Sequence, residues 1–215
     1  MDKPNMTEKQ VDTLYDAKYL KLYDLRYREG KHYFDATRRA AGDVVAIKSD
    51  EEFRAMLPDA VTIAVVLHLP KKQPKLLLSY EYRYPIGQFL LSPVAGLLDP
   101  EDRTEKNPLF GAAKREIFEE TGITLKKGDK LTVLNPCAFS SPGMTDESNA
   151  FLCADVYAEN TDMLNQNGAV GTELFNGFEL LSKTEAKKYY RTGRDRNGNT
   201  YSLATWAVLG YFISR

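Results

Sequence analysis

Three glutamates lie within five residues of one another in the stretch REIFEETGI, residues 115–123. In a helix, Glu116 and Glu120 stand one turn apart on the same face, with Glu119 beside them. Like charges at this spacing repel one another by roughly a few tenths of a kcal/mol per pair, so the arrangement calls for a counter-charge. One candidate is a hard divalent cation such as Mg²⁺, which takes oxygen ligands from a few carboxylates and from substrate phosphates. The alternative is a solvated acidic face that Lys114 and the arginine after it neutralise.

The segment that carries these glutamates has clear helix signals at both ends. Asn107 followed by Pro108 is a good helix start, because Asn caps free N–H groups and Pro suits the first helical position. Apolar residues then recur at helical spacing and should face a core. Gly122 is a good C-terminal cap, since glycine adopts the left-handed conformation without cost. The sequence therefore predicts a helix over residues 108–121.

Around this helix, apolar β-branched runs and partly alternating patterns predict strands, and capping motifs predict two further helices. The expected strands span residues 60–69, 75–84, 130–139, 149–160 and 172–181. Ser182 and Glu185 form a capping-box pattern for one helix, and residues 200–215 are expected to form the last. Strands and helices do not alternate regularly, so we expect an α+β fold, an α/β/α sandwich with a mixed sheet between helices.

The first 58 residues have a different pattern from the rest. Residues 19–39 predict a hairpin that turns at Glu29-Gly30, and residues 43–50 suggest another strand. A short helix is expected after Ser49 or Asp50 and before Pro58. We therefore expect a β-rich extension over residues 1–58 and a main domain over residues 59–215.

Composition excludes several classes of function. The net charge of −1 gives no global basic field for nucleic acid or an anionic membrane. No apolar run is long enough to span a membrane, and the N-terminus lacks the apolar region of a signal peptide. Cys137 and Cys153 form no CxxC pair, which suits a reduced, cytoplasmic protein. His32 and His68 are too few and too scattered for a zinc site or a catalytic triad.

The glycine turn and the glutamate helix together resemble the signature of the Nudix hydrolases, G-x5-E-x7-R-E-U-x-E-E-x-G-U, in which U is aliphatic. Gly96 matches the first glycine, and the second half matches throughout, at Arg115, Glu116, Ile117, Glu119, Glu120, Gly122 and Ile123. Gly96 to Ile123 is 28 residues against 23 in the signature, so five are extra. The position of the first glutamate is Asn107 counted from the arginine, and Asp102 counted from Gly96. Asp102 or Glu105 in the longer loop are the candidates to replace it.

The resemblance extends to the ADP-ribose pyrophosphatase branch over roughly residues 60–213. The residues YRYP at 82–85, preceded by Glu81, are similar to that branch's E-Q-Y-R-Y-P, and SSPGMTDES at 140–148 to its S-P-G-x-[ST]-[DE]-E loop. The branch usually has E-x-P-A-G before the signature, whereas this chain has Ser92 for Glu and Val94 for Pro.

The resemblance implies a Nudix fold and hydrolysis of the diphosphate bond in a nucleoside diphosphate linked to another group. ADP-ribose, giving AMP and ribose 5-phosphate, is the first substrate it suggests, and UDP-, GDP- or ADP-sugars are the alternative. It implies Mg²⁺ as cofactor, with Mn²⁺ as an alternative. The metal ligands would be Glu116, Glu119, Glu120 and the carbonyl of Ala95, and Glu119 could instead be an orienting base. The other functional class is a ligand-binding Nudix module without activity.

Further roles follow from the same resemblance. Glu147 is the expected general base, with Asp146 as the alternative carboxylate, and Arg115 supports catalysis by holding helix and loop together. Arg83 would bind phosphates unless it forms a structural ion pair.

The resemblance also implies contacts to the base and to a second subunit. Tyr82 is expected near a base, alongside Tyr80 and Tyr84, with packing as the alternative. Arg39, or Arg38, would reach the site of a partner subunit, because the N-terminal extension often builds a homodimer in this branch, in some members by strand exchange.

Overall fold

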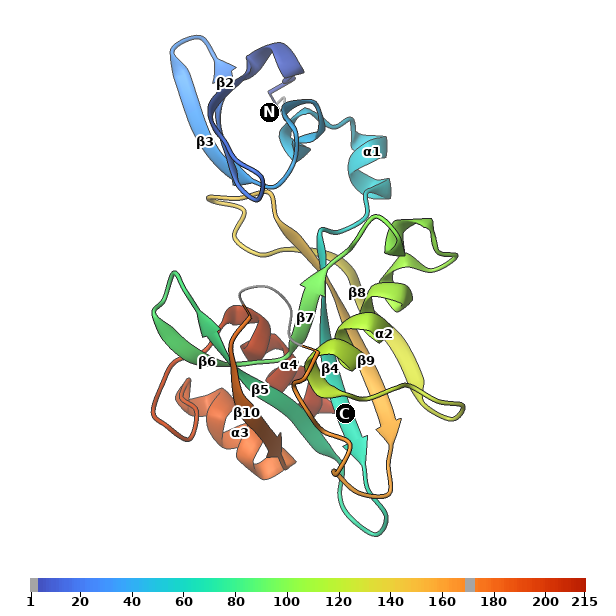
Figure 1. The fold of residues 1–215 in the computed structure, drawn as a ribbon. Coiled ribbons are helices and arrows are strands. Elements are labelled where there is room, and N and C mark those ends of the chain that lie inside the picture. Colours follow the sequence, from blue (N-terminus) through green and yellow to red (C-terminus); the bar gives the residue numbers. More distant parts are fainter. Residues whose placement is uncertain (1–3, 169–172) are drawn as a thin grey trace. The chain divides into compact units, whose positions relative to one another are not determined.

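The computed structural model describes residues 4–168 and 173–215 (Figure 1). The chain forms two compact units, which are described separately below. Unit 1 consists of Met1–Asp59 and Cys137–Asn149, and unit 2 consists of Ala60–Pro136 and Ala150–Arg215.

A seven-stranded sheet forms the framework of unit 2. Its central path has the order β10-β5-β4-β9-β8, with β6 paired to β5 and β7 paired to β4. The strands are β4 (Ala60–His68), β5 (Lys75–Arg83), β6 (Gln88–Ser92), β7 (Val94–Leu97), β8 (Lys130–Phe139), β9 (Ser148–Tyr157) and β10 (Phe175–Leu181). The end of β8 and the start of β9 are counted with unit 1. The predicted strand over residues 172–181 begins at Thr172, which lies outside the described residues.

Along one of its edges, strand β4 pairs with two different strands in turn, while β9 lies along the other edge. Its first half, Ala60 to Ile63, pairs antiparallel with β7, and Val65 to Leu67 pair antiparallel with β5. Strand β7 therefore pairs with the part of β4 that β5 does not pair with. This brings the glycine turn of the signature into the sheet, next to the most buried strand.

Helices pack on both faces of the sheet, as alternate residues of β4 show. Val61, Ile63 and Val65 share a core with helix α2 (Pro108–Thr121). Ala64 and Val66 point the other way and share a core with α3 (Lys183–Thr192) and α4 (Leu203–Ser214). The mixed α+β organisation predicted from the sequence is confirmed, and unit 2 has helix, sheet and helix layers (Figure 1).

Helix α2 begins and ends where its caps predict. The Asn107 side chain accepts a hydrogen bond from the Phe110 N–H at 3.3 Å, and Pro108 occupies the first position. Gly122 has a φ of 73° and its N–H donates to the Phe118 carbonyl at 2.8 Å. Two local caps thus fix the position of all three glutamates along the helix.

Unit 1 contains a three-stranded antiparallel sheet of β1 (Val11–Asp16), β2 (Lys21–Arg28) and β3 (Lys31–Thr37). The hairpin predicted at Glu29-Gly30 is confirmed, and Gly30 has a φ of 63°. Strand β1 was not expected from the sequence. Helix α1 (Asp50–Ala55) is capped by Ser49, which resolves the choice between Ser49 and Asp50.

The predicted strand over residues 43–50 is wrong. Ala41–Asp43 and Val45–Ile47 form short 3-10 turns instead. Val44 is fully buried in the small core of unit 1, and the Val45 N–H donates to the Asp146 side chain at 2.9 Å. Because a side chain and local turn bonds satisfy this backbone, it has no need of a strand partner.

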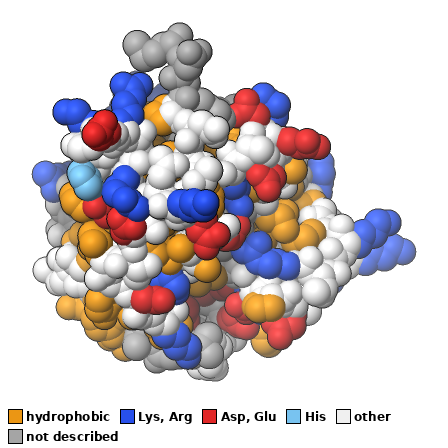
Figure 2. All heavy atoms as spheres, turned by 90° about the horizontal axis from the view of Figure 1, so that it is seen from above, with side chains coloured by type: hydrophobic (Ala, Val, Ile, Leu, Met, Phe, Trp, Pro, Cys, Tyr) orange, Lys and Arg blue, Asp and Glu red, His pale blue; other side chains and the backbone are white. Residues whose placement is uncertain are grey.

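The surface charge and the lengths of the helices are both consistent with what the composition led us to expect. Figure 2 shows acidic and basic side chains interspersed on the displayed face, without a dominant sign. Within residues 4–168 and 173–215, no helix combines the length and apolar character needed to cross a membrane. Cys137 and Cys153 are both free thiols.

Candidate functional site

Two of the three glutamates are buried against the sheet of unit 2. Glu116 is 6% exposed and Glu120 is 4% exposed. The Glu120 Oε1 atom accepts a hydrogen bond from the backbone N–H of Ala95 on β7 at 3.1 Å. Its other oxygen, Oε2, is buried and has no hydrogen-bond partner. Helix α2 and strand β7 therefore hold a carboxylate that has one acceptor atom unused, which is costly in a protein interior.

Gly96 leaves the space that the Glu116 carboxylate fills. A Cβ atom built on Gly96 would overlap the Glu116 carboxylate far inside van der Waals contact. The first glycine of the signature is therefore required by close approach of a side chain, because the backbone there is ordinary extended strand. The glycine and the glutamate, twenty residues apart, form one structural feature.

Arg115 ties α2 to the loop before it. Its Nη1 atom lies 2.6 Å from Glu116 Oε1 and 3.1 Å from Glu119 Oε2. Its Nη2 atom donates to the Leu97 carbonyl at 2.8 Å and to Asp102 Oδ2 at 2.9 Å. The Arg115 guanidinium thus neutralises part of the negative charge on the helix. This was expected if the three glutamates formed a solvated acidic face paired with basic neighbours.

Asp102, one of the two candidates to replace the first glutamate of the signature, is the loop carboxylate that accepts a hydrogen bond from Arg115. It is buried, with 6% exposure, and also accepts a hydrogen bond from the Asp99 N–H at 3.0 Å. Asn107, the other position reached by counting, caps the helix instead. In this longer loop, Asp102 supplies the carboxylate that binds Arg115.

Burial shifts the protonation of both glutamates on the inner face. It raises the pKa of Glu116 to about 7, and the negative charges of Glu119 and Glu173 add to this, although Arg115 opposes it. It also raises the pKa of Glu120 well above its ordinary value, against the hydrogen bond from Ala95 and with help from Glu81. Two such carboxylates take up either a proton or a cation.

The donor set fits Mg²⁺ in the way this ion usually binds to proteins. Across the described residues, no three His, Cys, Asp or Glu side chains are gathered as a ready-made metal cage. Mg²⁺ seldom needs one, because it binds through one or two carboxylates and otherwise through water and phosphate oxygens. Glu116 and Glu120 supply such a pair, and the unused oxygen of Glu120 supports the fit. Glu119 is engaged by Arg115, which suits an orienting role as well as a ligand role.

Arg83 and Tyr82 stand on β5, in the same unit as the glutamates. The Arg83 Nη2 atom lies 2.5 Å from Glu81 Oε2, and about half of the arginine side chain is exposed. Tyr82 makes edge-to-face contacts with Tyr84 and Phe89 at ring-centre distances of 5.0 and 5.2 Å. Tyr82 therefore packs among aromatic rings, while Arg83 keeps donors open to solvent.

Glu81 is a site residue that the sequence reasoning missed. It is largely buried, and burial raises its pKa while Arg83 lowers it. The signal was present in the sequence, because residues at i and i+2 of a strand share a face. Glu81 and Arg83 therefore lie on the same face of β5.

In unit 1, the two acidic residues of the loop after β8 have different surroundings. Asp146 accepts a hydrogen bond from Val45 and lies 3.5 Å from Arg39 Nε, while Arg39 Nη2 lies 2.7 Å from Asp59. Glu147 is more exposed, with its Oε2 atom 3.4 Å from Arg38 Nε. Arg39 and Asp146 thus belong to a buried ion-pair cluster, and Glu147 keeps the freer carboxylate. Glu147 and the glutamates of α2 belong to different units, so their joint action stays a prediction.

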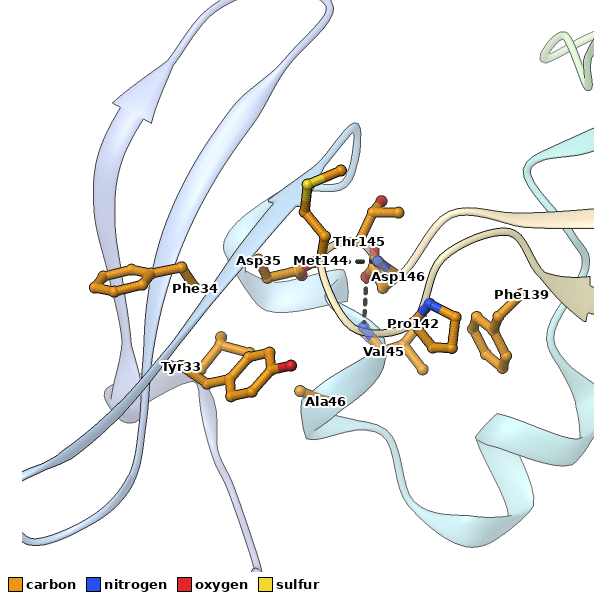
Figure 3. A pocket seen from close by; sticks show the side chains of 11 residues that line it. Tyr33, Phe34, Asp35, Val45, Ala46, Phe139, Pro142, Met144, Thr145 and Asp146 are labelled. Atoms are coloured by element: carbon orange, nitrogen blue, oxygen red, sulfur yellow. Dashed lines mark hydrogen bonds between the residues drawn. The ribbon is translucent and has the colours of Figure 1, made fainter. Parts of the chain in front are cut away.

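A small cavity of about 210 Å³ lies beside this loop within unit 1 (Figure 3). Tyr33, Phe139, Pro142 and Met144 give it mostly apolar walls. The Tyr33 hydroxyl donates to the Gly143 carbonyl at 2.9 Å and so joins β3 to the loop. Burial, with repulsion from Asp146, raises the pKa of Asp35 at the cavity wall to about 6.

Comparison with known proteins gives three similarities and no match to a family model. The chain is 27% identical over 157 residues to an uncharacterized Nudix hydrolase of Schizosaccharomyces pombe, and 32% identical over 128 residues to "Putative nudix hydrolase 2" of Caenorhabditis elegans. It is 39% identical over 77 residues to "Nudix hydrolase 14, chloroplastic" of Arabidopsis thaliana. These matches cover 72%, 58% and 33% of this chain.

The matched regions span only part of each relative, namely 66%, 53% and 24% of their lengths. All three relatives are named as Nudix hydrolases at modest identity, which supports the Nudix family for this chain.

Proposed function

We propose that this chain is a Nudix hydrolase that cleaves the diphosphate bond of a nucleoside diphosphate linked to another group. The observation that carries the proposal is the pair of buried carboxylates, Glu116 and Glu120, set against the glycine turn at Gly96. Arg115 pairs with Glu116, whereas Glu120 is buried with one oxygen unpartnered, which costs stability unless a proton or a cation binds there. The three similarities to proteins named as Nudix hydrolases support the same reading.

Glu116 and Glu120, beside the backbone of Ala95, would hold a divalent cation, with Mg²⁺ as our first choice and Mn²⁺ as the alternative. The bound cation would supply charge neutralisation at the diphosphate oxygens. Arg115 fixes the helix to its loop through Asp102 and orients Glu119. Glu147 would take a proton from the attacking water, because its carboxylate is more exposed than that of Asp146 and so suits this role better.

Substrate choice within this class rests on residues around the turn. The YRYP segment favours ADP-ribose, with Arg83 at the phosphates and Tyr82 nearby as an aromatic support. The alternative is a sugar nucleotide, because Ser92 replaces a carboxylate that the branch usually has. Ser92 is 3% exposed and donates its hydroxyl to the Leu90 carbonyl at 3.3 Å, so it offers the site no charge.

We also propose that two copies of the chain associate through the sheet of unit 1. Tyr15 on β1 and Phe34 on β3, the two outer strands of this small sheet, are each 56% exposed, which is unusual for large apolar side chains. In a homodimer, Arg38 is the arginine available to a partner's site, because Arg39 has only 10% of its side chain exposed. A cytoplasmic location remains part of the same prediction.

The proposal is tested by a phosphate-release screen of nucleoside diphosphate derivatives, with Mg²⁺ or Mn²⁺ and a coupled phosphatase. We expect turnover of at least one compound and a loss of roughly 100-fold or more in Glu120→Gln, because removing a metal ligand costs several kcal/mol of transition-state stabilisation. Glu159→Gln is the matched control, since Glu159 is exposed and follows β9.

Two outcomes would overturn parts of the proposal. No turnover of any compound, together with tight binding of one, indicates a ligand-binding module instead of an enzyme. Unchanged turnover in Glu120→Gln refutes the metal assignment but leaves the hydrolase intact.

A further inference from the structure

Strand β5 carries a buried carboxylate directly behind the arginine that faces solvent. Residues 76, 78 and 80 of this strand belong to the core under α3 and α4, whereas Leu77 belongs to the core under α2. Since side chains alternate along a strand, Glu81 and Arg83 continue the Leu77 face, which is the face that α2 covers. Their register partners on β6 are Leu90 and Gln88, so the pairing is regular here.

The two side chains have opposite exposure. Glu81 has 13% of its side chain exposed and Arg83 has 47%, with 2.5 Å between Glu81 Oε2 and Arg83 Nη2. One end of the guanidinium is thus held from the protein side. The rest of its five donors remain available to a ligand.

Glu81 also acts electrostatically on Glu120 of α2. Its negative charge contributes to the raised pKa of Glu120, and Glu173 acts on both Glu81 and Glu120. A further carboxylate in this place increases the local repulsion, so stability alone gives no reason for it. An exposed ion pair on a strand would need no buried carboxylate, because such pairs contribute little.

We infer that Glu81 is a positioning residue that holds Arg83 in place, so that its guanidinium binds a phosphate oxygen of the substrate. This inference rests on the proposed function and deepens it. A long, flexible arginine side chain loses rotamer freedom when it binds an anion. Holding one edge of the guanidinium beforehand reduces that loss, and leaves the other edge for bidentate contact.

The test separates anion binding from metal binding and from turnover. Calorimetry measures the affinity of the full-length protein for inorganic pyrophosphate with Mg²⁺, and separately for Mn²⁺ alone. In Glu81→Gln we expect pyrophosphate affinity to fall roughly tenfold, as the loss of one charge-assisted contact implies. Mn²⁺ affinity should stay within about twofold of the wild-type value. For a hydrolysed substrate, KM should rise by the same factor as the pyrophosphate affinity falls, while kcat stays nearly constant.

A double-mutant cycle shows whether Glu81 acts through Arg83. Arg83→Gln should weaken pyrophosphate binding at least as much as Glu81→Gln, and the double variant should be no weaker than Arg83→Gln alone. Additive losses would overturn the inference, because Glu81 would then act on its own. Glu159→Gln again serves as the control for a lost surface charge.

The remaining outcomes also decide the matter. Wild-type pyrophosphate affinity in Glu81→Gln refutes the positioning role, and a large loss of Mn²⁺ affinity makes Glu81 a metal ligand instead. If Glu81→Gln does not fold, Glu81→Asp, which keeps the charge but shortens the side chain, should show the same selective loss of pyrophosphate affinity. A wild-type protein that binds pyrophosphate but hydrolyses nothing refutes the proposed function while the cycle still tests this inference.

Discussion

At the scale of single residues, the site is governed by burial of charge. Glu116 and Glu120 would be ordinary carboxylates on an exposed helix, and the sheet removes them from water. Arg115 compensates one of them, at 2.6 Å from Glu116, and leaves Glu120 with an unused oxygen. This imbalance makes both protonation and cation binding sensitive to small changes nearby.

The raised pKa of Glu116 predicts a distinct pH dependence for the metal-free protein. The folded pKa is about 7 against an ordinary value of 4.5, so the folded state holds more protons than the unfolded state between these values. This group therefore lowers the free energy of unfolding as pH rises through that window, by on the order of 3 kcal/mol. Denaturant titrations at about pH 5 and about pH 8 should show this fall, and Glu116→Gln should reduce it, with Glu120 still contributing to the remainder.

Added Mg²⁺ or Mn²⁺ should reverse that trend, because carboxylates must lose their protons to bind a metal. We expect a larger stabilisation by the metal at the higher pH. A Glu116→Gln protein whose stability profile runs parallel to that of the wild type would contradict the assignment of the pH effect to this residue.

Gly96→Ala should disturb the site without disturbing the strand. The new Cβ would occupy the position of the Glu116 carboxylate, so this side chain must move. We expect Mn²⁺ affinity to fall by roughly tenfold or more, as expected for a displaced ligand. Gly87→Ala is the control, since a Cβ there meets open space and only the φ of 66° is strained. The control should cost about 1 kcal/mol of stability and leave Mn²⁺ affinity unchanged. Equal Mn²⁺ affinity in both variants would refute the role of Gly96.

At the scale of elements, the site is made where α2, β7 and the loop before α2 meet. The Ala95 N–H on β7 binds Glu120, and Arg115 on α2 binds both the Leu97 carbonyl and Asp102. Helix caps set the start and end of α2, whereas Arg115 sets its attachment to the loop. These two kinds of support can be separated by mutation.

Asp102→Ala should destabilise the protein more than Asn107→Ala. The first change removes one of the two buried carboxylates that pair with the Arg115 guanidinium and should cost roughly 2 kcal/mol. The second removes only a helix cap and should cost about 1 kcal/mol. Urea unfolding of both variants measures the two losses of unfolding free energy, provided that the dependence of that free energy on urea concentration has the same slope in each variant. A smaller loss in Asp102→Ala than in Asn107→Ala would show that another residue supports Arg115.

At the scale of the whole molecule, each unit has its own hydrophobic core and contributes different candidate functional residues. Unit 2 contains the carboxylate pair, and unit 1 contains Glu147 and a sheet with exposed aromatic residues. With a net charge of −1 there is no strong global repulsion between copies of the chain. The proposed association through unit 1 would therefore depend on the apolar side chains on its sheet.

Phe34→Glu should convert a dimer to a monomer if the sheet of unit 1 is the interface. A buried charge at an apolar contact is costly unless it is paired. Light scattering after gel filtration should give about twice the chain mass of 24.3 kDa for the wild type, and the chain mass for the variant. Lys31→Glu, on the same strand, is a charge control that should leave the mass unchanged. A wild-type monomer, or a dimeric Phe34→Glu protein, would refute this interface.

Features of this protein that depend on neighbouring residues could be predicted from the sequence alone. Asn107, Pro108 and Gly122 defined α2 to the residue, because caps depend on neighbouring backbone only. The spacing of Glu116, Glu119 and Glu120 gave the candidate cation site for the same reason. The strand predicted over residues 43–50 was wrong, because a short apolar pattern does not show which groups bind the backbone N–H and C=O groups.

Features that depend on contacts between distant segments could not be predicted in this way and required the folded chain. The loop before α2 has five extra residues, so counting along the chain could not tell whether Asp102 or Asn107 is the partner of Arg115. The folded structure shows that it is Asp102. The burial of Glu120 under β7 and the presence of Glu81 on the face covered by α2 likewise follow from strand pairing. Burial and pairing arise from the packed sheet, and these physical effects turn a row of glutamates into a candidate site.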